Sequence, residues 1–329
     1  MTATFTDSFG RQHTYLRLAV TDRCDLRCHY CMPPQPAWRA PEELLTDDEI
    51  VGAVSLFAGL GITKVRLTGG EPTVRPGLIA LVARLASVPG IHTLGMTTNG
   101  LRLPEMAALL RDAGLSTTAL NVSLDSLRPD RYRRITGSDT FPEALAGLAA
   151  AQQAGFAPLK LNVVVMRGVN DDELGDFVAF AVERDLNVRF IEYMPFPGNQ
   201  WEAARFVSAA EMRATISAHY RLEAAPPANG AVAKGYRVVG AAGLVSFITP
   251  LSDDFCAACR RLRLTADGAV KTCLFHPAEF SLRELLRRGE PEDKIIAALR
   301  LALATKPERH PPAEALVRMH ARSMVEIGG

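Results

Sequence analysis

Long hydrophobic runs are absent from the sequence, which excludes a membrane-spanning helix. Residues 1–10 include Asp7 and are not apolar, so we expect neither a signal peptide nor a transit sequence. A one-sided charge is also lacking, since 37 Lys and Arg face 36 Asp and Glu, and the net charge is +1. Such a balance gives no general attraction to nucleic acid or to an anionic membrane. We expect a cytoplasmic protein with neither partner, in which any anion site is local.

Cysteine is scarce, with six residues among 329, but the six fall into two tight groups. Without a secretion signal, this grouping favours metal binding over disulfides. The first group, Cys24, Cys28 and Cys31, can turn its thiols to one side only if the backbone loops around a shared centre. A 4Fe-4S cluster accepts three thiolates and leaves one iron open. A structural zinc site is the alternative, but His29 is poorly placed as the fourth ligand that zinc needs.

The second group, Cys256, Cys259 and Cys273, again offers three ligands and no obvious fourth. A CxxC pair alone is compatible with zinc or with redox chemistry. Arg261 and Arg263 follow it, and alternate residues of a strand share one face, so both guanidinium groups would lie beside the metal and suit phosphate oxygens. An exposed, charged edge strand is the alternative. No GxxxxGK[ST] motif occurs, so side chains would hold the phosphates and triphosphate hydrolysis is not indicated.

Predicted strands alternate with predicted helices through the first two thirds of the sequence. Six strands are predicted, at residues 15–20, 64–68, 91–97, 118–123, 159–165 and 188–193. Between them, helices are predicted from an N-cap at Thr46 to residue 59 or 61, and at 77–85, 104–113, 142–154 and 172–184. This order predicts an α/β fold of parallel βαβ units, a partial (β/α)6 barrel, with most functional residues at the carboxyl ends of its strands.

The alternation stops near residue 225, where residues 226–230 form a turn-rich linker. We therefore predict two regions. Residues 1–224 would form the partial barrel, and residues 225–329 would form a C-terminal region with the second cysteine group and a terminal Gly328-Gly329 pair.

The CxxxCxxC pattern with Tyr30 before its last cysteine resembles the radical S-adenosylmethionine superfamily. That resemblance implies that the open iron chelates S-adenosylmethionine and that its reduction yields a 5′-deoxyadenosyl radical. Residues 68–72 resemble the family's glycine-rich segment, which meets the methionyl amine. The resemblance implies four cofactor-binding residues: Tyr30, Gly70, Ser123 and Met194. Taken singly, each is also compatible with a turn, a strand-end cap or core packing.

The second cysteine group and its arginines narrow the resemblance to the GTP 3′,8-cyclase family of molybdenum cofactor biosynthesis. Matching stretches are residues 21–24, 97–100, 121–125, 189–192 and 255–268. The resemblance implies two 4Fe-4S clusters, with guanine held at the open iron of the second one. It also implies GTP binding, chiefly through triphosphate and ribose, by Arg17, Arg66, Thr97, Lys160, Arg189, Arg261 and Arg263.

The reaction implied by this resemblance is that of a lyase. The radical would take the hydrogen from the ribose 3′ carbon, and this carbon would attack guanine C8. A reduction and a proton transfer would then give (8S)-3′,8-cyclo-7,8-dihydroguanosine 5′-triphosphate, in the first step of the pathway. We predict Arg17 as the source of the last hydrogen, and Gly328 and Gly329 would enter the active site. An external electron donor would reduce the protein, and the product would pass to the next enzyme.

Two other functions are compatible with parts of the pattern. A radical S-adenosylmethionine peptide maturase would share the first motif but would usually have more C-terminal cysteines. A zinc-stabilised binding module would need neither the Gly-Gly-Glu-Pro segment nor the six βα units. The sequence does not decide the oligomeric state, and a homodimer is compatible with it.

Overall fold

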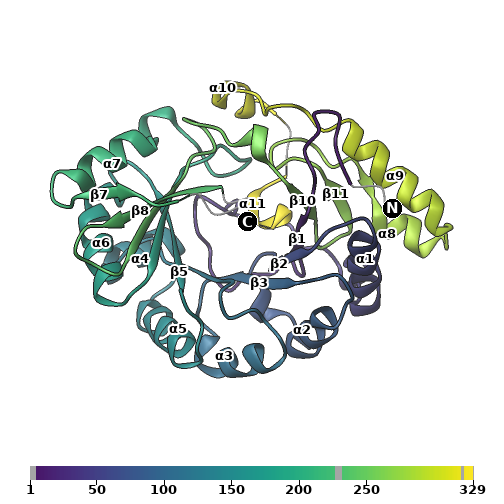
Figure 1. Ribbon diagram of the computed structural model, residues 1–329, viewed down its shortest axis with the longest axis horizontal. Helices are drawn as coiled ribbons and strands as arrows, with labels where there is room; N and C mark the ends of the chain where they lie inside the picture. Colours follow the sequence, from purple (N-terminus) through teal and green to yellow (C-terminus); the bar gives the residue numbers. More distant parts are fainter. Residues whose placement is uncertain (1–4, 227–231, 320–321, 329) are drawn as a thin grey trace.

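One β-sheet runs through the computed structural model, which describes residues 5–226, 232–319 and 322–328. The strand order is β12-β11-β10-β1-β2-β3-β4-β5-β6-β9-β8-β7. From β10 to β9, each strand is parallel to its neighbours, and only the outer strands at the two ends pair antiparallel. These parallel strands curve around the centre of the molecule, with the helices outside them (Figure 1).

The parallel strands are β10 (Arg261–Leu264), β1 (Tyr15–Ala19), β2 (Lys64–Thr68), β3 (Thr93–Thr98), β4 (Leu120–Ser123), β5 (Lys160–Val165), β6 (Asn187–Glu192) and β9 (Leu244–Ile248). The outer strands are β11 (Ala269–Lys271) and β12 (Phe280–Ser281) at one end, and β8 (Ala233–Val238) and β7 (Leu222–Ala224) at the other.

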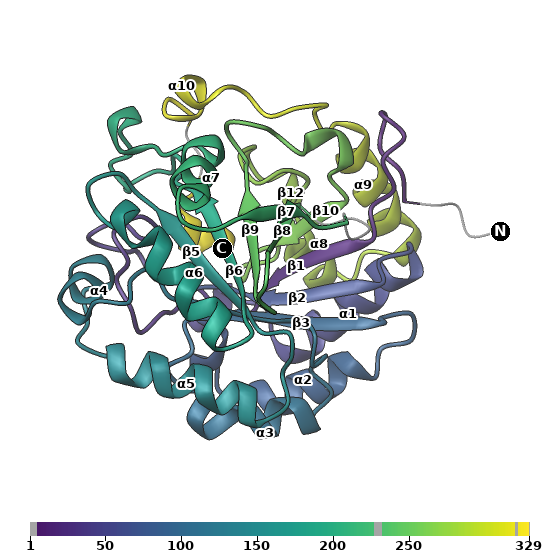
Figure 2. The same cartoon turned by 60° about the vertical axis from the view of Figure 1, so that its left-hand side comes forward.

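The α-helices are α1 (Asp47–Gly59), α2 (Leu78–Ala86), α3 (Leu103–Asp112), α4 (Pro129–Thr136), α5 (Phe141–Gln153), α6 (Leu174–Glu183), α7 (Ala209–Ser217), α8 (Leu282–Arg287), α9 (Glu292–Ala304), α10 (Ala313–Leu316) and α11 (Met324–Ile327). Short 3-10 helices lie at Pro41–Glu43, Pro72–Val74, Asp171–Glu173, Ala203–Arg205 and Cys256–Ala258. Figure 2 shows β1, β2 and β3 side by side, with α2, α3 and α5 along the outside of the wall. No helix in the described ranges is long and apolar enough to cross a membrane.

Alternation along each strand separates an apolar outer face from a polar inner face. On β1, Leu16 and Leu18 are fully buried in the core between sheet and helices, where they join Ile50 and Phe57 of α1. Burying one such side chain contributes roughly 1.5–3 kcal/mol, so this layer supplies much of the stability. Tyr15 and Arg17 point the other way, into a central cavity.

The six predicted strands are confirmed as β1 to β6, with ends that differ by at most two residues. The N-cap prediction is also confirmed, because the Thr46 side chain accepts from the Glu49 backbone N–H and Glu49 returns the bond. Helix α4 was not predicted, since Arg131, Arg133 and Arg134 leave it little apolar periodicity.

The sheet does not end where the alternation ends. Strands β9 and β10 come from beyond residue 225 and pair in parallel with β6 and β1, so the wall crosses the predicted boundary between the two regions. The predicted linker at 226–230 lies outside the described residues except for Pro226.

Candidate active site

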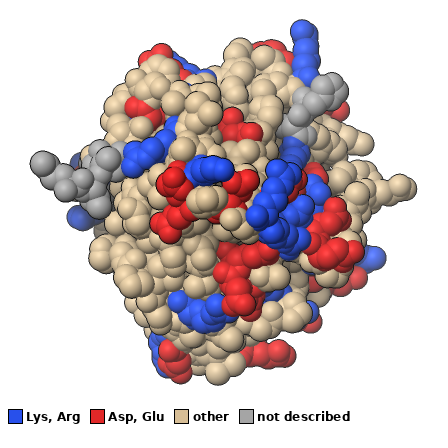
Figure 3. Space-filling model, turned by 90° about the vertical axis from the view of Figure 1, so that its right-hand side faces the viewer, with Lys and Arg blue, Asp and Glu red and all other residues tan. Residues whose placement is uncertain are grey.

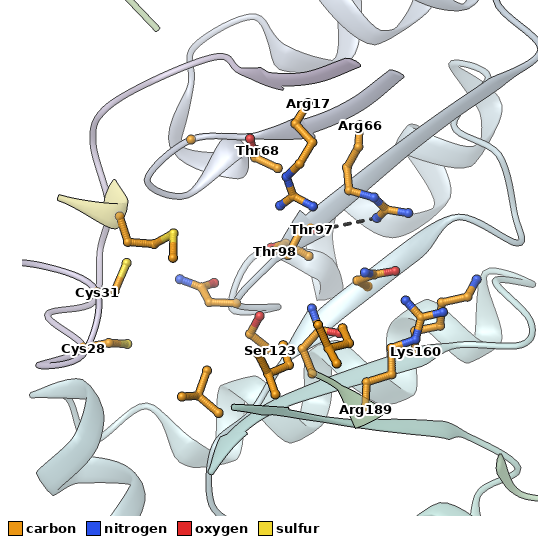
Figure 4. A pocket seen from close by; sticks show the side chains of 18 of the residues that line it. Arg17, Cys28, Cys31, Arg66, Thr68, Thr97, Thr98, Ser123, Lys160 and Arg189 are labelled. Atoms are coloured by element: carbon orange, nitrogen blue, oxygen red, sulfur yellow. Dashed lines mark hydrogen bonds between the residues drawn. The ribbon is translucent and has the colours of Figure 1, made fainter. Parts of the chain in front are cut away.

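A cavity of about 540 Å³ occupies the centre of the curved sheet. In Figure 4, Cys28 and Cys31 lie at one end, Lys160 and Arg189 lie at the other, and Arg17 and Arg66 project between them. All the residues predicted to bind the cofactor or GTP line this cavity: Tyr30, Gly70, Ser123 and Met194, and Arg17, Arg66, Thr97, Lys160, Arg189, Arg261 and Arg263. The fold thus brings together residues from seven parallel strands and the loops that follow them.

The first cysteine triad, Cys24, Cys28 and Cys31, lies on the loop that follows β1. The Cys31 and Met32 amides both donate to the Cys28 carbonyl, at 3.0 and 3.1 Å, which turns the loop back on itself. All three thiols are free and reach the cavity wall. Burial raises the pKa of Cys24 and Cys31 to about 12, so cluster binding there would have to displace thiol protons.

Gly69 and Gly70 let the segment after β2 lie against the chain that enters the cysteine loop. The Gly70 amide donates to the Thr21 carbonyl at 2.9 Å. A Cβ atom on Gly69 would lie 2.3 Å from the Thr21 oxygen, and one on Gly70 would lie 2.1 Å from the Arg23 oxygen. Both positions therefore require glycine because this segment packs directly against the protein's own backbone, next to Cys24.

Glu71 links this segment to the end of β3. Its buried carboxylate accepts hydrogen bonds from the Thr98 hydroxyl and the Asn99 amide, both at 2.7 Å. The Asn99 side chain in turn donates to Asp25 in the cysteine loop at 2.6 Å. Burial raises the pKa of Glu71 although these bonds oppose the shift. Glu71 therefore fixes two βα turns and, through Asn99, the cysteine loop.

Tyr30 is hydrogen-bonded to Asp125, which follows β4. The Tyr30 hydroxyl donates to Asp125 Oδ2 at 2.7 Å, and the Val164 amide donates to Asp125 Oδ1 at the same distance. Burial raises the pKa of Asp125 to about 6. Ser123, at the end of β4, and Met194, beyond β6, complete this side of the cavity.

The basic residues form registered layers on the inner face of the sheet. Arg17 on β1 is paired in register with Arg66 on β2 and Arg263 on β10. One layer below, Tyr15 is in register with Lys64 and Arg261. These side chains sit within the strands, below the carboxyl ends at which most of the site was expected.

Arg66 shows how the interior makes room for a guanidinium group. Its Nε donates to the Tyr15 hydroxyl at 2.7 Å, and its Nη1 donates to the Met96 carbonyl at 2.7 Å and the Ala119 carbonyl at 3.0 Å. The next strand has Gly95 in register with Arg66, and a Cβ there would lie 3.1 Å from Arg66 Nη2. The absent side chain of Gly95 thus leaves the space that Arg66 fills.

Burial and mutual repulsion destabilise the charged forms of these cations. Burial, with repulsion by neighbouring cations, lowers the pKa of Arg17 and Arg189 to about 10. The same causes lower the pKa of Lys160 to about 8. Burial alone would raise the pKa of Tyr15, but Arg66, Arg17 and Lys64 outweigh it and lower the pKa to about 7. A bound polyanion would relieve this repulsion.

Several buried polar atoms on the cavity wall have no hydrogen-bond partner within the described part of the chain. They are Thr68 Oγ1, Asn121 Oδ1, Asn162 Oδ1 and Arg189 Nε. Buried polar groups are almost always paired in folded proteins. Their concentration here fits a site built to hold a polar ligand.

The second triad, Cys256, Cys259 and Cys273, lines a smaller adjoining cavity. Arg261 and Arg263 are among the residues that line both cavities, so the two sites share a wall. Burial raises the pKa of Cys256 to about 11. Burial would raise the pKa of Cys259 too, but Arg261 and Lys306 lower it to about 7.

Across residues 5–226, 232–319 and 322–328, no three His, Cys, Asp or Glu side chains are grouped to hold a single metal ion. Each triad instead lines a cavity wall.

The predicted tail residue Gly328 follows α11, which lies at the centre of Figure 1, and reaches the inner face of the barrel. Its carbonyl accepts a hydrogen bond from Arg263 Nη1 at 2.6 Å. Its φ is +83°, and a Cβ would lie 2.6 Å from Thr68 Oγ1, so glycine fits this position on both counts. Gly329, the other predicted tail residue, lies outside the described residues.

The sequence interpretation missed several lining residues. Tyr15 and Lys64 could have been found, since they share the inward face with Arg17 and Arg66 at a spacing of two. Asn121, Asn162 and Asp125 follow the same alternation on β4 and β5 or lie just beyond it. Lys306, beside the second triad, carries no local sequence signal.

Two family models match consecutive parts of the chain. The Radical SAM superfamily model matches residues 18–181, and the Molybdenum Cofactor Synthesis C model matches residues 186–312. A solved structure of Streptococcus suis SuiB bound to the precursor peptide SuiA has a TM-score of 0.62 at 12% identity, over 95% of this chain and 75% of that one. This likeness establishes a shared fold.

Curated relatives match over nearly the full chain. Molybdenum cofactor biosynthesis protein 1 of Mus musculus is 44% identical over 328 residues, which are 99% of this chain and 51% of that protein, so the chain spans about half the length of this relative. The GTP 3′,8-cyclase of Geobacter sulfurreducens is 46% identical over 330 residues, with 98% of this chain and 99% of that protein covered. At that identity and coverage, the chain belongs to the GTP 3′,8-cyclase family of the radical SAM superfamily.

Proposed function

We propose that this protein converts GTP to (8S)-3′,8-cyclo-7,8-dihydroguanosine 5′-triphosphate, the first step of molybdenum cofactor biosynthesis. The observation that carries the proposal is the basic inner layer, which lines one cavity together with the first cysteine triad and, through Arg261 and Arg263, shares a wall with the cavity of the second triad. A near-neutral chain that binds a triphosphate needs locally concentrated positive charge, and this layer supplies it.

In this proposal Cys24, Cys28 and Cys31 hold a 4Fe-4S cluster that, with bound S-adenosylmethionine, supplies a 5′-deoxyadenosyl radical. Gly70 sets the close approach of backbone to the methionyl group. Tyr30, Ser123 and Met194 position the adenosyl group on the same side of the cavity. The Asp125 contact fixes the orientation of Tyr30.

Cys256, Cys259 and Cys273 would hold a second 4Fe-4S cluster, which would supply an open iron as a binding position for guanine. Arg17, Arg66, Thr97, Lys160, Arg189, Arg261 and Arg263 hold the triphosphate and ribose between the two triads. Fixing the ribose 3′ carbon and guanine C8 in one enclosed site makes their bond formation intramolecular and excludes other partners of the substrate radical. Arg17 is the proposed source of the final hydrogen, and Gly328 and Gly329 close the site.

An external electron donor and transfer of the product to the next enzyme belong to the same proposal. So do a cytoplasmic location and a homodimer. We also propose a boundary between a barrel region at 1–224 and a cluster region at 225–329. This boundary divides the chain by function, since the sheet itself is continuous across it.

The test is anaerobic purification followed by turnover. We expect brown protein with about eight irons per chain, the content of two such clusters. Reduced protein incubated with S-adenosylmethionine and GTP should give 5′-deoxyadenosine and a cyclised product of the same mass as GTP, which mass analysis with chromatography separates. The matched control is Cys28→Ser, which should leave about four irons and abolish both products. Zinc without iron, or 5′-deoxyadenosine formation with GTP unchanged, would reject the proposal.

A further inference from the structure

Lys306 is a buried lysine that packs behind the second cysteine triad and has no role in the proposed GTP site. It follows α9, and only 4% of the residue is exposed. Helix α9 lies on the same side of the molecule as β10 in Figures 1 and 2. The backbone amide of Lys306 donates to the Leu303 carbonyl at 3.1 Å, so the end of the helix fixes where the side chain begins.

The ammonium group has three acceptors, which matches its three N–H bonds. Nζ donates to the Thr272 carbonyl at 2.7 Å, to the Arg261 carbonyl at 3.0 Å and to Cys259 Sγ at 3.7 Å. Thr272 directly precedes Cys273, and Arg261 lies two residues after Cys259. One side chain thus joins the two chain segments that carry two of the three ligands.

None of these three acceptors is a carboxylate. A buried ammonium is costly unless a negative group lies near it, and the one acceptor here that can become negative is the Cys259 sulfur. The lysine therefore suits a deprotonated, metal-bound thiolate better than a neutral thiol.

Charged groups of both signs lie near each triad: Arg27 Nη1 donates to the Cys24 carbonyl at 2.7 Å in the first, and Asp254 Oδ1 accepts from the Cys256 amide at 3.0 Å in the second. Asp25 lies 4.0 Å from Cys24 Sγ in the first triad, and Glu71 and Asp125 line the same cavity. Arg11 and Lys306 line the second site, where Arg11 Nη1 donates to the Cys256 carbonyl at 2.9 Å. Asp7 and His13 lie behind Arg11, and Asp7 Oδ2 accepts from Arg11 Nε at 2.6 Å.

We propose that Lys306 is a positioning residue of the second site: it donates an N–H···S bond to Cys259 and raises the reduction potential of the cluster held there. Positive charge and hydrogen bonds to cluster sulfurs favour the reduced state, which carries one more negative charge. This inference rests on the proposed second cluster.

The test compares Lys306→Met, Lys306→Gln and Lys306→Arg in the full-length protein with both clusters. EPR-monitored redox titration gives the two midpoint potentials, and a chain with Cys24, Cys28 and Cys31 all replaced by Ser identifies the signal of the second cluster. Lys294→Met is the matched control, because Lys294 lies on α9 with its side chain 69% exposed, where it pairs with Glu290.

We expect Lys306→Met to shift the second midpoint potential to more negative values. Lys306→Gln should give a smaller shift in the same direction, and Lys306→Arg and Lys294→Met should give values near that of the unchanged protein. The first midpoint potential should stay constant throughout. Equal second potentials in the unchanged protein and in Lys306→Met would overturn the inference.

The glutamine and arginine variants cover the case in which Lys306→Met does not retain its second cluster. If Lys306→Arg loads this cluster at the original potential and Lys306→Gln loads it at a more negative one, the inference holds. If neither variant binds the second cluster, the site requires the shape of the lysine side chain and not its charge, and the inference fails. Failure of the proposed function is recognised separately, because the unchanged protein would then contain no second cluster.

Discussion

Tyr15 stands among cations at the base of the cavity, where its hydroxyl accepts a hydrogen bond from Arg66. Arg66, Arg17 and Lys64 overcome the effect of burial and lower its pKa to about 7, so a large fraction is ionised near neutral pH. An ionised Tyr15 repels a triphosphate. Binding of GTP should therefore be accompanied by proton uptake at this residue.

We predict that GTP affinity falls as pH rises from 7 to 9. Above about 7 Tyr15 becomes negative, and above about 8 Lys160 loses its positive charge, so both changes oppose anion binding. For one linked proton the limit is about tenfold in Kd per pH unit. Calorimetric titration across this range should show the slope, and Tyr15→Phe should flatten its lower part. An identical slope in Tyr15→Phe would contradict this assignment.

Arg189 offers a second test at the level of one residue. Its buried Nε has no partner in the described chain, and burial with repulsion by Arg66 lowers its pKa to about 10. We predict that Arg189→Ala weakens GTP binding about 10- to 100-fold, the effect of one lost charge-assisted contact. Equilibrium dialysis measures the change. Arg221→Ala, at a side chain 79% exposed, should bind GTP like the unchanged protein.

At the scale of structural elements, the turn after β2 leaves no room for a Cβ atom at Gly69 or Gly70. We predict that Gly70→Ala costs about 1–3 kcal/mol of unfolding free energy, as overpacking does, and loses the iron of the first site, because the new Cβ would meet the Arg23 carbonyl. Iron analysis and denaturant unfolding measure both effects. Gly52→Ala within α1 is the control: its Cβ meets nothing within 4 Å and should stabilise the helix by about 0.5–1 kcal/mol. Full iron content in Gly70→Ala would refute the prediction.

Local sequence patterns were sufficient to predict the helix start and the strands that depend on neighbouring residues alone. Thr46 and Glu49 marked the start of α1, and alternation marked β1 to β6. Residues 261–263 were predicted to lie on a strand, but the pairing of this strand, β10, with β1 was not, and β9 was not predicted at all. The parallel partners of both strands are set by contacts across long stretches of chain, and no helix marks them as βα units. The cysteines of the candidate site were plain from spacing. Glu71 as the link between turns, and Lys306 behind Cys259, follow only from the three-dimensional structure.

On the scale of the whole molecule, positively charged side chains line the central cavity, whereas side chains of both charges alternate on the surface shown in Figure 3. The face in Figure 3 shows Lys and Arg interspersed with Asp and Glu, in keeping with the net charge of +1. The inner layer of Arg17, Arg66 and Arg263 is therefore the local anion site that we propose for a chain of balanced charge. Its affinity should depend on salt less than that of an exposed basic patch, since buried charges are screened less.

The C-terminal tail joins distant parts of the chain. Arg322 pairs with Asp267 at 2.6 Å, and Arg39, from the loop beyond the first triad, pairs with the same carboxylate at 3.3 Å.

We predict that deleting Gly328 and Gly329 abolishes turnover while about eight irons per chain remain, because the deletion removes the carbonyl held by Arg263 and spares every cysteine. Product mass analysis and iron content test this together. An unchanged product yield would rule out a role for the tail.

The pairing of β1 with β10 has a further consequence for how the protein folds. During synthesis β1 is made early, but the strand that covers its outer edge is made only after most of the chain. Until then one side of β1 is an unpaired edge, which can join strands of other molecules. Because pairings between distant segments also form slowly, the nascent chain should pass through an aggregation-prone period that ends only when β10 arrives.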